Sequence, residues 1–244
     1  MTMKLQKSLF SWFSKELAHP EAFFSFLQQH GITAIYQHVT PDDTQETIAR
    51  FIERGCQLNI KVFLLAGEAN WALEPEALHR HIEQAAKWDG IVVDVEPYLL
   101  KGFNKEIMTA YVSAMRNAYQ KARSLGVTFI LCIPYFYDSL GYTTELEVLI
   151  RDCCDGISVM NYYRGQEIPH LETEAKLCRL YRKSLETIYE LQPPGKHDLK
   201  DINTYYHLGL KKVDENFQTL AKHYQNQEVK ISYHEFVYFQ ELAE

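Results

Sequence analysis

Two carboxylates, Asp94 and Glu96, lie two positions apart in the apolar segment WDGIVVDVEPYLL at residues 88–100. Side chains alternate along a strand, so Asp94 and Glu96 share one face with Gly90 and Val92. Two ionised carboxylates this close repel each other, and burial adds to the cost, so one is expected to hold a proton near neutral pH. This arrangement suits general acid catalysis, and we predict Glu96 as the acid with Asp94 in support.

A structural role is the alternative, in which the two acids only tie the strand end to its surroundings through ion pairs. No Lys or Arg lies next to either acid in the segment, and burying unpaired carboxylates is costly. Pro97 cannot donate a ladder hydrogen bond and therefore ends the predicted strand. The two acids are thus expected at the carboxyl end of a strand.

Strands and helices alternate along the whole chain. The segments that predict strands are rich in apolar and β-branched residues, and they are residues 8–13, 33–39, 60–67, 90–98, 127–137, 156–163, 186–192 and 229–239. Amphipathic segments that predict helices lie between them, at residues 41–55, 74–88, 104–126, 172–184 and 211–225. The connection between the fifth and sixth strands is short.

This alternation predicts an α/β fold, a (β/α)8 TIM barrel formed by residues 1–244 as a single domain. An open doubly wound sheet is the competing fold. No glycine-rich phosphate-binding motif follows any predicted strand, and this disfavours the open sheet. In a barrel, the shared face of Asp94 and Glu96 is the interior, and its carboxyl end is where barrel enzymes keep their chemistry.

Two predicted strands begin with the same tripeptide, Asp-Gly-Ile, at residues 89–91 and 155–157. They are the fourth and sixth strands, and alternate strands of a barrel contribute to the same layer of interior side chains. The polar residues that follow them are therefore expected to meet in one pocket.

The spacing Asp89-Gly90-x-x-x-Asp94-x-Glu96 resembles the strand-four motif of the chitinase-type glycoside hydrolases, family 18. The later segment SVMNYY resembles the strand-six motif of that family, with Met160 and Tyr162 in place. The resemblance implies an activity on an N-acetylated oligo- or polysaccharide. It implies that Glu96 protonates the glycosidic oxygen, that Asp94 orients the N-acetyl group that attacks the anomeric carbon, and that Tyr162 hydrogen-bonds this group.

The chain departs from the family pattern at several positions. Val92 occupies the place of an inner acid, and Tyr163 occupies the place of the acid that usually follows the tyrosine. The eighth predicted strand lacks the usual tryptophan and offers Tyr233 and Phe236 instead. These departures support a second hypothesis, a catalytically inactive barrel that binds carbohydrate.

Glu190, in the segment TIYELQ, ends the seventh predicted strand. The dipeptide Glu96-Pro97 is also similar to the N-E-P motif of the large retaining-glycosidase clan, in which a Glu ending strand seven is the nucleophile. Carboxylates ~5–5.5 Å apart favour retention, and ~6.5–9.5 Å favours inversion. Glu190 is therefore predicted to contact the substrate, the alternative being a surface acid.

Further residues that are expected to contact the substrate follow the ends of other strands. They are Tyr36, Glu68, Trp71, Tyr135, Asn161 and Tyr233. The competing role is that of a loop anchor for Trp71 and core packing or a satisfied hydrogen bond for the others. His38, His234 and Glu235 lie at comparable positions. A metal site built from His38, Asp94, Glu96 and His234 is disfavoured because the first strand has no H-x-H motif. We therefore predict no catalytic metal and no cofactor.

Composition excludes several classes of partner. The formal net charge of −7 and the lack of a basic cluster argue against a nucleic-acid partner. No apolar run approaches the ~20 residues of a membrane span. The five cysteines are odd in number and form no C-x-x-C motif, which predicts reduced thiols rather than disulfides or zinc. The start of the chain does not resemble a signal peptide, so we expect a cytoplasmic protein, or a secreted one if a leader has been removed. The sequence leaves the oligomeric state open.

Overall fold

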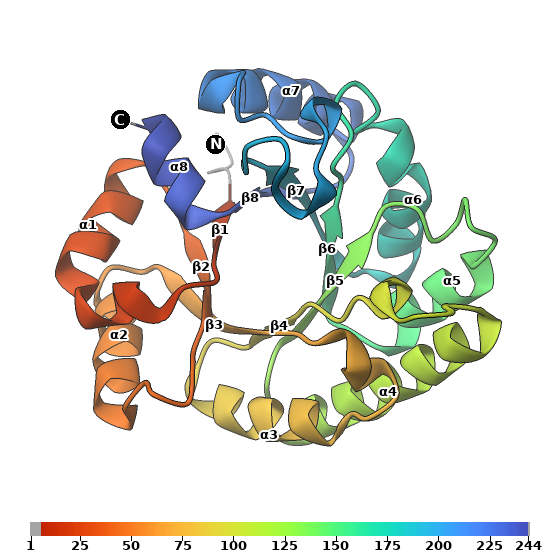
Figure 1. Cartoon of the computed structure of the whole chain (residues 1–244), viewed down its shortest axis with the longest axis horizontal. Helices are drawn as coiled ribbons and strands as arrows, with labels where there is room; N and C mark the ends of the chain where they lie inside the picture. The colour runs from red at the N-terminus through yellow and green to blue at the C-terminus, as the bar shows by residue number, and fades with distance from the viewer. Residues whose placement is uncertain (1–5, 244) are drawn as a thin grey trace.

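Eight parallel strands close into a barrel in which each strand pairs with the next and β8 pairs with β1 (Figure 1). The computed structural model describes residues 6–243. The strands are β1 (Lys7–Ser11), β2 (Ala34–His38), β3 (Lys61–Ala66), β4 (Ile91–Val93), β5 (Phe129–Pro134), β6 (Gly156–Met160), β7 (Ser184–Glu190) and β8 (Val229–His234). The predicted TIM barrel is therefore confirmed, and all eight predicted strands are present.

A ring of helices surrounds the barrel and packs apolar faces against it (Figure 1). These are α1 (Pro20–Gln29), α2 (Gln45–Gln57), α3 (Glu76–Gln84), α4 (Lys105–Ser124), α5 (Thr143–Asp152), α6 (Glu172–Tyr181), α7 (Gly209–His223) and α8 (Phe236–Ala243). Side-chain caps fix where some of them begin. Thr44 accepts a hydrogen bond from the backbone of Thr47 at the start of α2, and Asn104 accepts two at the start of α4.

The two Asp-Gly-Ile segments have a structural role at the amino ends of β4 and β6. Asp89 Oδ2 accepts a hydrogen bond of 2.8 Å from the Val62 N–H, and Asp155 Oδ2 accepts one of 2.9 Å from the Phe129 N–H. Each aspartate thus ties its own strand to the start of the preceding one. Asp89 lies at the opposite end of β4 from Asp94, so it belongs to the scaffold of the barrel.

The barrel interior is filled by inward-facing side chains, one or two from each strand. An apolar layer occupies the middle of the barrel and consists of Phe10, Tyr36, Leu65, Val92, Cys132, Met160 and Ile188. Beneath it, toward the amino ends, the Tyr36 hydroxyl donates to the buried carboxylate of Glu186 at 2.9 Å, and Ser158 Oγ donates at 2.5 Å. Burial raises the pKa of Glu186.

Three boundaries differ from the sequence prediction. Strand β4 ends at Val93, so Asp94 and Glu96 follow the strand, and Pro97 opens a short 3-10 turn over Pro97–Leu99. The end of the eighth predicted strand forms helix α8. The short connection between β5 and β6 holds helix α5.

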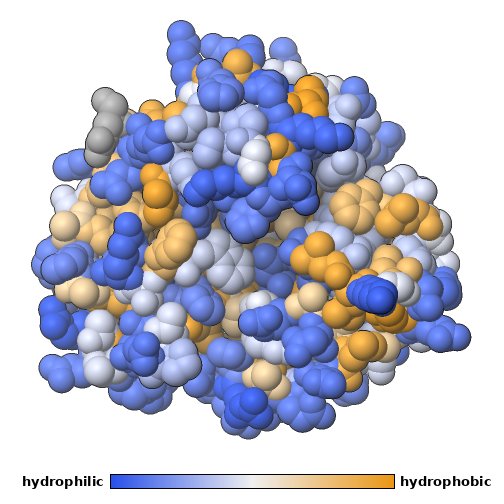
Figure 2. Space-filling view, in the orientation of Figure 1, coloured by the Kyte–Doolittle hydropathy of each residue, from blue (hydrophilic) through white to orange (hydrophobic). Residues whose placement is uncertain are grey.

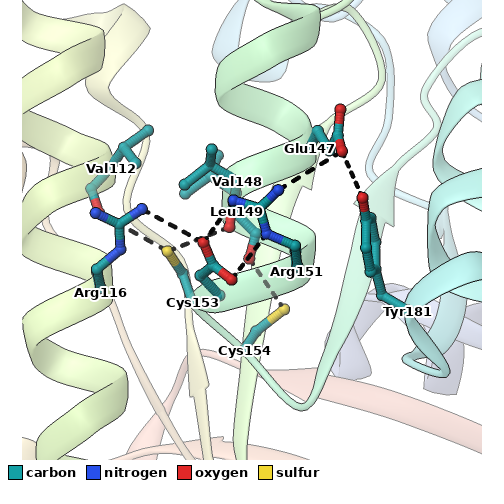
Figure 3. Close-up of polar contacts among 10 residues, drawn as sticks. Val112, Arg116, Glu147, Val148, Leu149, Arg151, Cys153, Cys154 and Tyr181 are labelled. Atoms are coloured by element: carbon teal, nitrogen blue, oxygen red, sulfur yellow. Dashed lines mark hydrogen bonds and ion pairs between the residues drawn. The ribbon is translucent and has the colours of Figure 1, made fainter.

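A polar network joins the outer surfaces of α4, α5 and α6 (Figure 3). Asp152 Oδ2 lies 3.5 Å from Arg116 Nη2 and 2.8 Å from Arg151 Nη2. Arg151 also pairs with Glu147, which accepts a hydrogen bond from Tyr181. The charged side chains of this network are 33–42% exposed, so each ion pair contributes little to stability.

The five cysteines are free thiols, four of them buried. Cys153 and Cys154 donate weak hydrogen bonds to backbone carbonyls of the neighbouring helices (Figure 3). No helix in residues 6–243 is long and apolar enough to cross a membrane.

Candidate active site

A cavity of about 770 Å³ opens at the carboxyl ends of the strands. Residues at the ends of six of the eight strands contribute to its walls. The lining residues are Trp12, Phe13, Asp94, Glu96, Tyr98, Leu99, Pro134, Tyr135, Phe136, Met160, Tyr162, Glu190, Gln192, His197, Asp198, Leu199, Asn203, His234 and Glu235. Figure 2 shows the barrel end drawn in Figure 1, with hydrophilic and hydrophobic residues around a central hollow. Carboxylates and aromatic rings thus share one cavity.

Asp94 and Glu96 both line this cavity, although neither lies within β4 itself. Burial, together with the negative charge of Glu96, raises the pKa of Asp94 to about 7, against a smaller opposing effect of His234. Asp94 Oδ1 is buried and has no hydrogen-bond partner among the described residues. Burial and the neighbouring charge therefore favour a proton on Asp94 near neutral pH.

Tyr98 orients the carboxylate of Glu96. Its hydroxyl donates to Glu96 Oε1, and burial, with the charge of Glu96, keeps the pKa of Tyr98 far above its usual value. The phenol therefore remains a donor throughout the ordinary pH range. Its ring packs edge-on against Phe136, with 5.1 Å between the ring centroids. Glu96 is thus held in one orientation at the cavity wall.

Glu190 and His234 form a buried pair on the opposite side of the barrel, at the ends of β7 and β8. His234 Nδ1 lies 3.0 Å from Glu190 Oε2, and the Gln192 backbone N–H donates to Glu190 Oε1 at 2.8 Å. Trp12 Nε1–H donates to His234 Nε2 at 3.0 Å. Both Glu190 oxygens and both ring nitrogens of His234 therefore have partners inside the protein.

The protonation of His234 is set by two opposing influences. Burial is the largest single influence and lowers its pKa, but the charge and hydrogen bond of Glu190, with the charges of Glu235 and Asp94, together outweigh burial and raise the pKa to about 9. The Trp12 N–H favours the neutral ring, because a protonated Nε2 would place one donor against another. When Trp12 donates to Nε2, the ring proton resides on Nδ1 and points to Glu190.

Tyr162 also lines the cavity. Its ring centroid lies 6.2 Å from that of His234. Burial, with the charges of Glu190, Asp94 and Glu96, raises the pKa of Tyr162 well above its usual value. Asn203 Nδ2 donates to the Tyr162 backbone carbonyl at 2.7 Å, which anchors the tyrosine to the loop after β7. Tyr162 therefore offers a neutral hydroxyl to a ligand.

Among the residues predicted from the sequence to act in catalysis or to contact the substrate, five line the cavity: Asp94, Glu96, Tyr135, Tyr162 and Glu190. The Tyr135 ring stacks on His170 with 3.9 Å between centroids and 9° between planes. One face of Tyr135 is therefore covered by His170, and this contact fixes the orientation of the ring at the wall.

Five other predicted contacts lie outside the cavity. The Tyr36 hydroxyl points to Glu186 at the amino end of the barrel. Trp71 is buried and packs against His81, with ring centroids 5.1 Å apart, so it anchors a loop. The Tyr233 ring faces the helices and donates to Asp214 at 3.1 Å, because it alternates with the inward-facing His234.

Asn161 and Glu68 are the other two predicted substrate contacts that do not line the cavity. Asn161 is buried on the opposite side from Tyr162, and its Nδ2 donates to the Glu167 carbonyl at 2.8 Å. Glu68 is exposed and does not line the cavity, because the chain turns away after β3 into a 3-10 turn. A position at the end of a strand therefore predicts contact with the cavity less well than the direction, inward or outward, in which the side chain points.

Sequence reasoning did not assign three residues that orient the predicted site: Trp12, Tyr98 and Gln192. Tyr98 lies two positions after Glu96 and Trp12 two positions after Phe10, which faces the interior. The same alternation of side chains that led to Asp94 and Glu96 would also have predicted that Tyr98 and Trp12 face the interior. Gln192 contacts Glu190 through its backbone N–H and His234 Nδ1 through its side-chain Nε2 at 3.1 Å, and no sequence pattern indicates either contact.

The described part of the chain contains no group of three or more His, Cys, Asp or Glu side chains arranged to hold a metal ion. His38 does not line the cavity. It contacts the Leu65 carbonyl at 3.3 Å and packs beside Trp12. The four residues considered for a metal site therefore do not share one wall.

No family model matches the chain, and no curated protein is detectably similar to it in sequence. Solved structures share its fold. A chitinase from Chromobacterium violaceum ATCC 12472 is 10% identical with a TM-score of 0.56, over 98% of this chain and 97% of that one. The spore cortex-lytic enzyme SleL of Bacillus megaterium QM B1551 is 9% identical with a TM-score of 0.61, over 95% and 70%.

D-psicose 3-epimerase from Clostridium cellulolyticum H10 is similar to the same degree, with 11% identity and a TM-score of 0.56 over 93% of this chain and 84% of that one. Proteins with different chemistry thus match about equally well. At such low identity the likeness concerns the fold, and function has to be argued from the site. The comparisons and the strand topology together identify the chain as a TIM barrel.

Proposed function

We propose that this protein is a glycoside hydrolase that cleaves an N-acetylated oligo- or polysaccharide. The observation that carries the proposal is the meeting of Asp94, Glu96 and Tyr162 in one cavity with aromatic walls. Carboxylates and a phenol hydrogen-bond sugar hydroxyl and amide groups, while Trp12, Tyr135 and Phe136 offer ring surface to the apolar faces of sugars.

In the proposed reaction, Glu96 protonates the glycosidic oxygen as the bond to the anomeric carbon breaks. The carbonyl oxygen of the substrate's N-acetyl group attacks the anomeric carbon, oriented by Asp94 and Tyr162. The raised pKa of Asp94 keeps a proton at the Asp94–Glu96 pair near neutral pH, and Glu96 has to carry a proton when the glycosidic bond breaks. Glu96 then accepts a proton from the water that opens the cyclic intermediate.

The contacts of Glu190 favour this substrate-assisted route over an enzyme nucleophile. Its side chain is 2% exposed, and its two oxygens are engaged by the Gln192 N–H and by His234. A carboxylate that attacks the anomeric carbon has to present an oxygen to the substrate. Glu190 instead fits the role of holding His234, and through it Trp12, in place.

The departures at Val92 and Tyr163 keep a second candidate function open, a barrel that binds carbohydrate without cleaving it. Val92 is buried in the apolar layer under the site, and Tyr163 is 39% exposed outside it, so neither supplies an acid to the cavity. The two functions share every wall residue and differ only in bond cleavage.

The test uses aryl glycosides and soluble oligosaccharides of N-acetylated sugars with the wild-type protein and the Glu96→Gln variant. The proposal expects turnover by the wild type and a loss of about 10²–10⁴-fold in the variant. Glu74→Gln, an exposed change on the same barrel end, serves as the matched control. Equal turnover by wild type and Glu96→Gln would overturn the proposal, and binding without any cleavage by the wild type would favour the second candidate.

A further inference from the structure

The charges around the cavity are strongly one-sided. Five carboxylates line it, those of Asp94, Glu96, Glu190, Asp198 and Glu235, and no Lys or Arg in residues 6–243 does. The His234–Glu190 contact balances one of the five at most. The excess of carboxylates over cationic side chains therefore favours a positively charged ligand in the cavity.

Glu235 is a buried carboxylate in the wall of the cavity. It is 6% exposed, lies directly after β8, and forms no ion pair within the described residues. Burial is the largest cause of its raised pKa and the charge of Glu190 adds to it, although the charges of His234 and Lys196 and a hydrogen bond from the Trp12 backbone oppose the rise. A buried carboxylate in a cavity wall is costly unless a cation or several donors meet it. Asp94 Oδ1, also in the cavity wall, is buried and has no hydrogen-bond partner among the described residues.

The remaining walls are suited to the same kind of ligand. Aromatic rings from Trp12, Tyr98, Tyr135, Phe136 and Tyr162 surround the carboxylates. The faces of such rings attract cations through their quadrupole, and carboxylates attract them through charge. The chain as a whole carries a formal charge of −7, which also favours the approach of a cationic polymer.

We propose that the substrate is a cationic amino-sugar chain, one that is only partly N-acetylated and carries free ammonium groups. Glu235 and Asp198 bind ammonium groups on the sugars that flank the reacting one. Asp94, Glu96 and Tyr162 act on the N-acetylated sugar between them. The identity of the reacting bond rests on the proposed function, whereas the preference for ammonium groups rests on the charge of the cavity.

Binding measured by calorimetry tests this preference without requiring cleavage. The probes are the tetramer of glucosamine and the tetramer of N-acetylglucosamine, each titrated at about pH 6 into the Glu96→Gln protein, which leaves both ligands intact. We expect the ammonium-bearing tetramer to bind about tenfold more tightly, the scale of one good charge-assisted contact. This advantage should shrink at high salt.

Two variants locate the effect. Glu235→Gln and Asp198→Asn, each added to Glu96→Gln, should weaken binding of the glucosamine tetramer severalfold and leave the N-acetylated tetramer unchanged. Asp198 is exposed on the loop after β7, so its variant remains informative should Glu235→Gln fail to fold. Glu74→Gln and Asp42→Asn remove the same charges from exposed positions outside the cavity and should leave both affinities unchanged.

Equal or tighter binding of the fully N-acetylated tetramer would overturn the inference, as would an unchanged glucosamine affinity in both cavity variants. The proposed function fails by a different result, the absence of Glu96-dependent cleavage of any N-acetylated glycoside. The two failures are therefore distinguishable.

Discussion

Glu190 and His234 are directly opposite each other where β7 pairs with β8, and Glu190 Oε2 lies 3.0 Å from His234 Nδ1. The strand pairing brings together two residues that are 44 positions apart in the chain. The pair also holds Trp12 through Nε2, so three elements meet at this point of the cavity. The protonation of His234 makes the stability of the barrel depend on pH.

The first prediction concerns the pH dependence of the contribution that Glu190 makes to stability. The pKa of His234 is raised from 6.5 to about 9, so its stabilisation is complete below pH 6.5 and is lost as pH rises through about 9. Glu190→Gln should therefore lower the free energy of unfolding most below pH 6.5, by on the order of 3 kcal/mol, and progressively less toward pH 9. Urea denaturation of both proteins across this range measures it; a constant difference would contradict the link to His234.

The second prediction concerns the alkaline side of the pH–activity profile. Asp94 has a pKa of about 7, so the proton of the Asp94–Glu96 pair is lost as pH rises through 7. For the proposed hydrolase, kcat/KM should fall above about pH 7. Asp94→Asn should be slower, by roughly 10²-fold or more, and should lose the limb near pH 7. A wild-type profile that stays level to pH 9 would rule out this assignment.

The third prediction is that Asp94→Asn stabilises the fold at alkaline pH. A carboxyl whose pKa is raised on folding has to ionise in an unfavourable environment, so the folded protein loses stability as pH rises from about 4 to 7. The neutral amide avoids this cost. The variant should gain on the order of 2 kcal/mol over the wild type at pH 8, and this gain should disappear near pH 4. Thermal melts at the two pH values provide the measurement.

The fourth prediction separates orientation of Glu96 from its acidity. Tyr98→Phe removes the hydroxyl that donates to Glu96 Oε1 and leaves the ring that packs on Phe136. We expect kcat to fall by about tenfold, in line with the loss of one positioning hydrogen bond, with little change in KM or melting temperature. Should kcat be unaffected, Tyr98 would have only a packing role.

The fifth prediction tests the correction made for Tyr36. Tyr36→Phe should leave carbohydrate binding and turnover unchanged, because the hydroxyl lies at the amino end of the barrel. It should destabilise the fold by about 1–3 kcal/mol, since the buried Glu186 loses a donor. Chemical denaturation and activity assays on the same samples distinguish the two effects, and a fall in affinity without a fall in stability would restore Tyr36 to the site.

The sequence by itself determined the barrel and one wall of the cavity. The alternation of apolar strands and amphipathic helices is a local property, so all eight strands were found within a few residues of their bounds. The spacing of Asp94 and Glu96 is also local, and a period of two predicts that both point to the same side, although the strand itself ends at Val93. Both acids therefore came out on the interior side.

Only the tertiary structure decided which distant residues complete the site. The contacts among Trp12, Glu190 and His234 depend on closing the barrel between β8 and β1, and on the register of β7 against β8. It also decided that the pKa of Asp94 is raised, because pKa values depend on burial and on neighbouring charges. The sequence predicted that three further residues contact the substrate: Tyr36, Trp71 and Tyr233. The direction and packing of each side chain depend on neighbouring strands and helices, which direct all three away from the cavity.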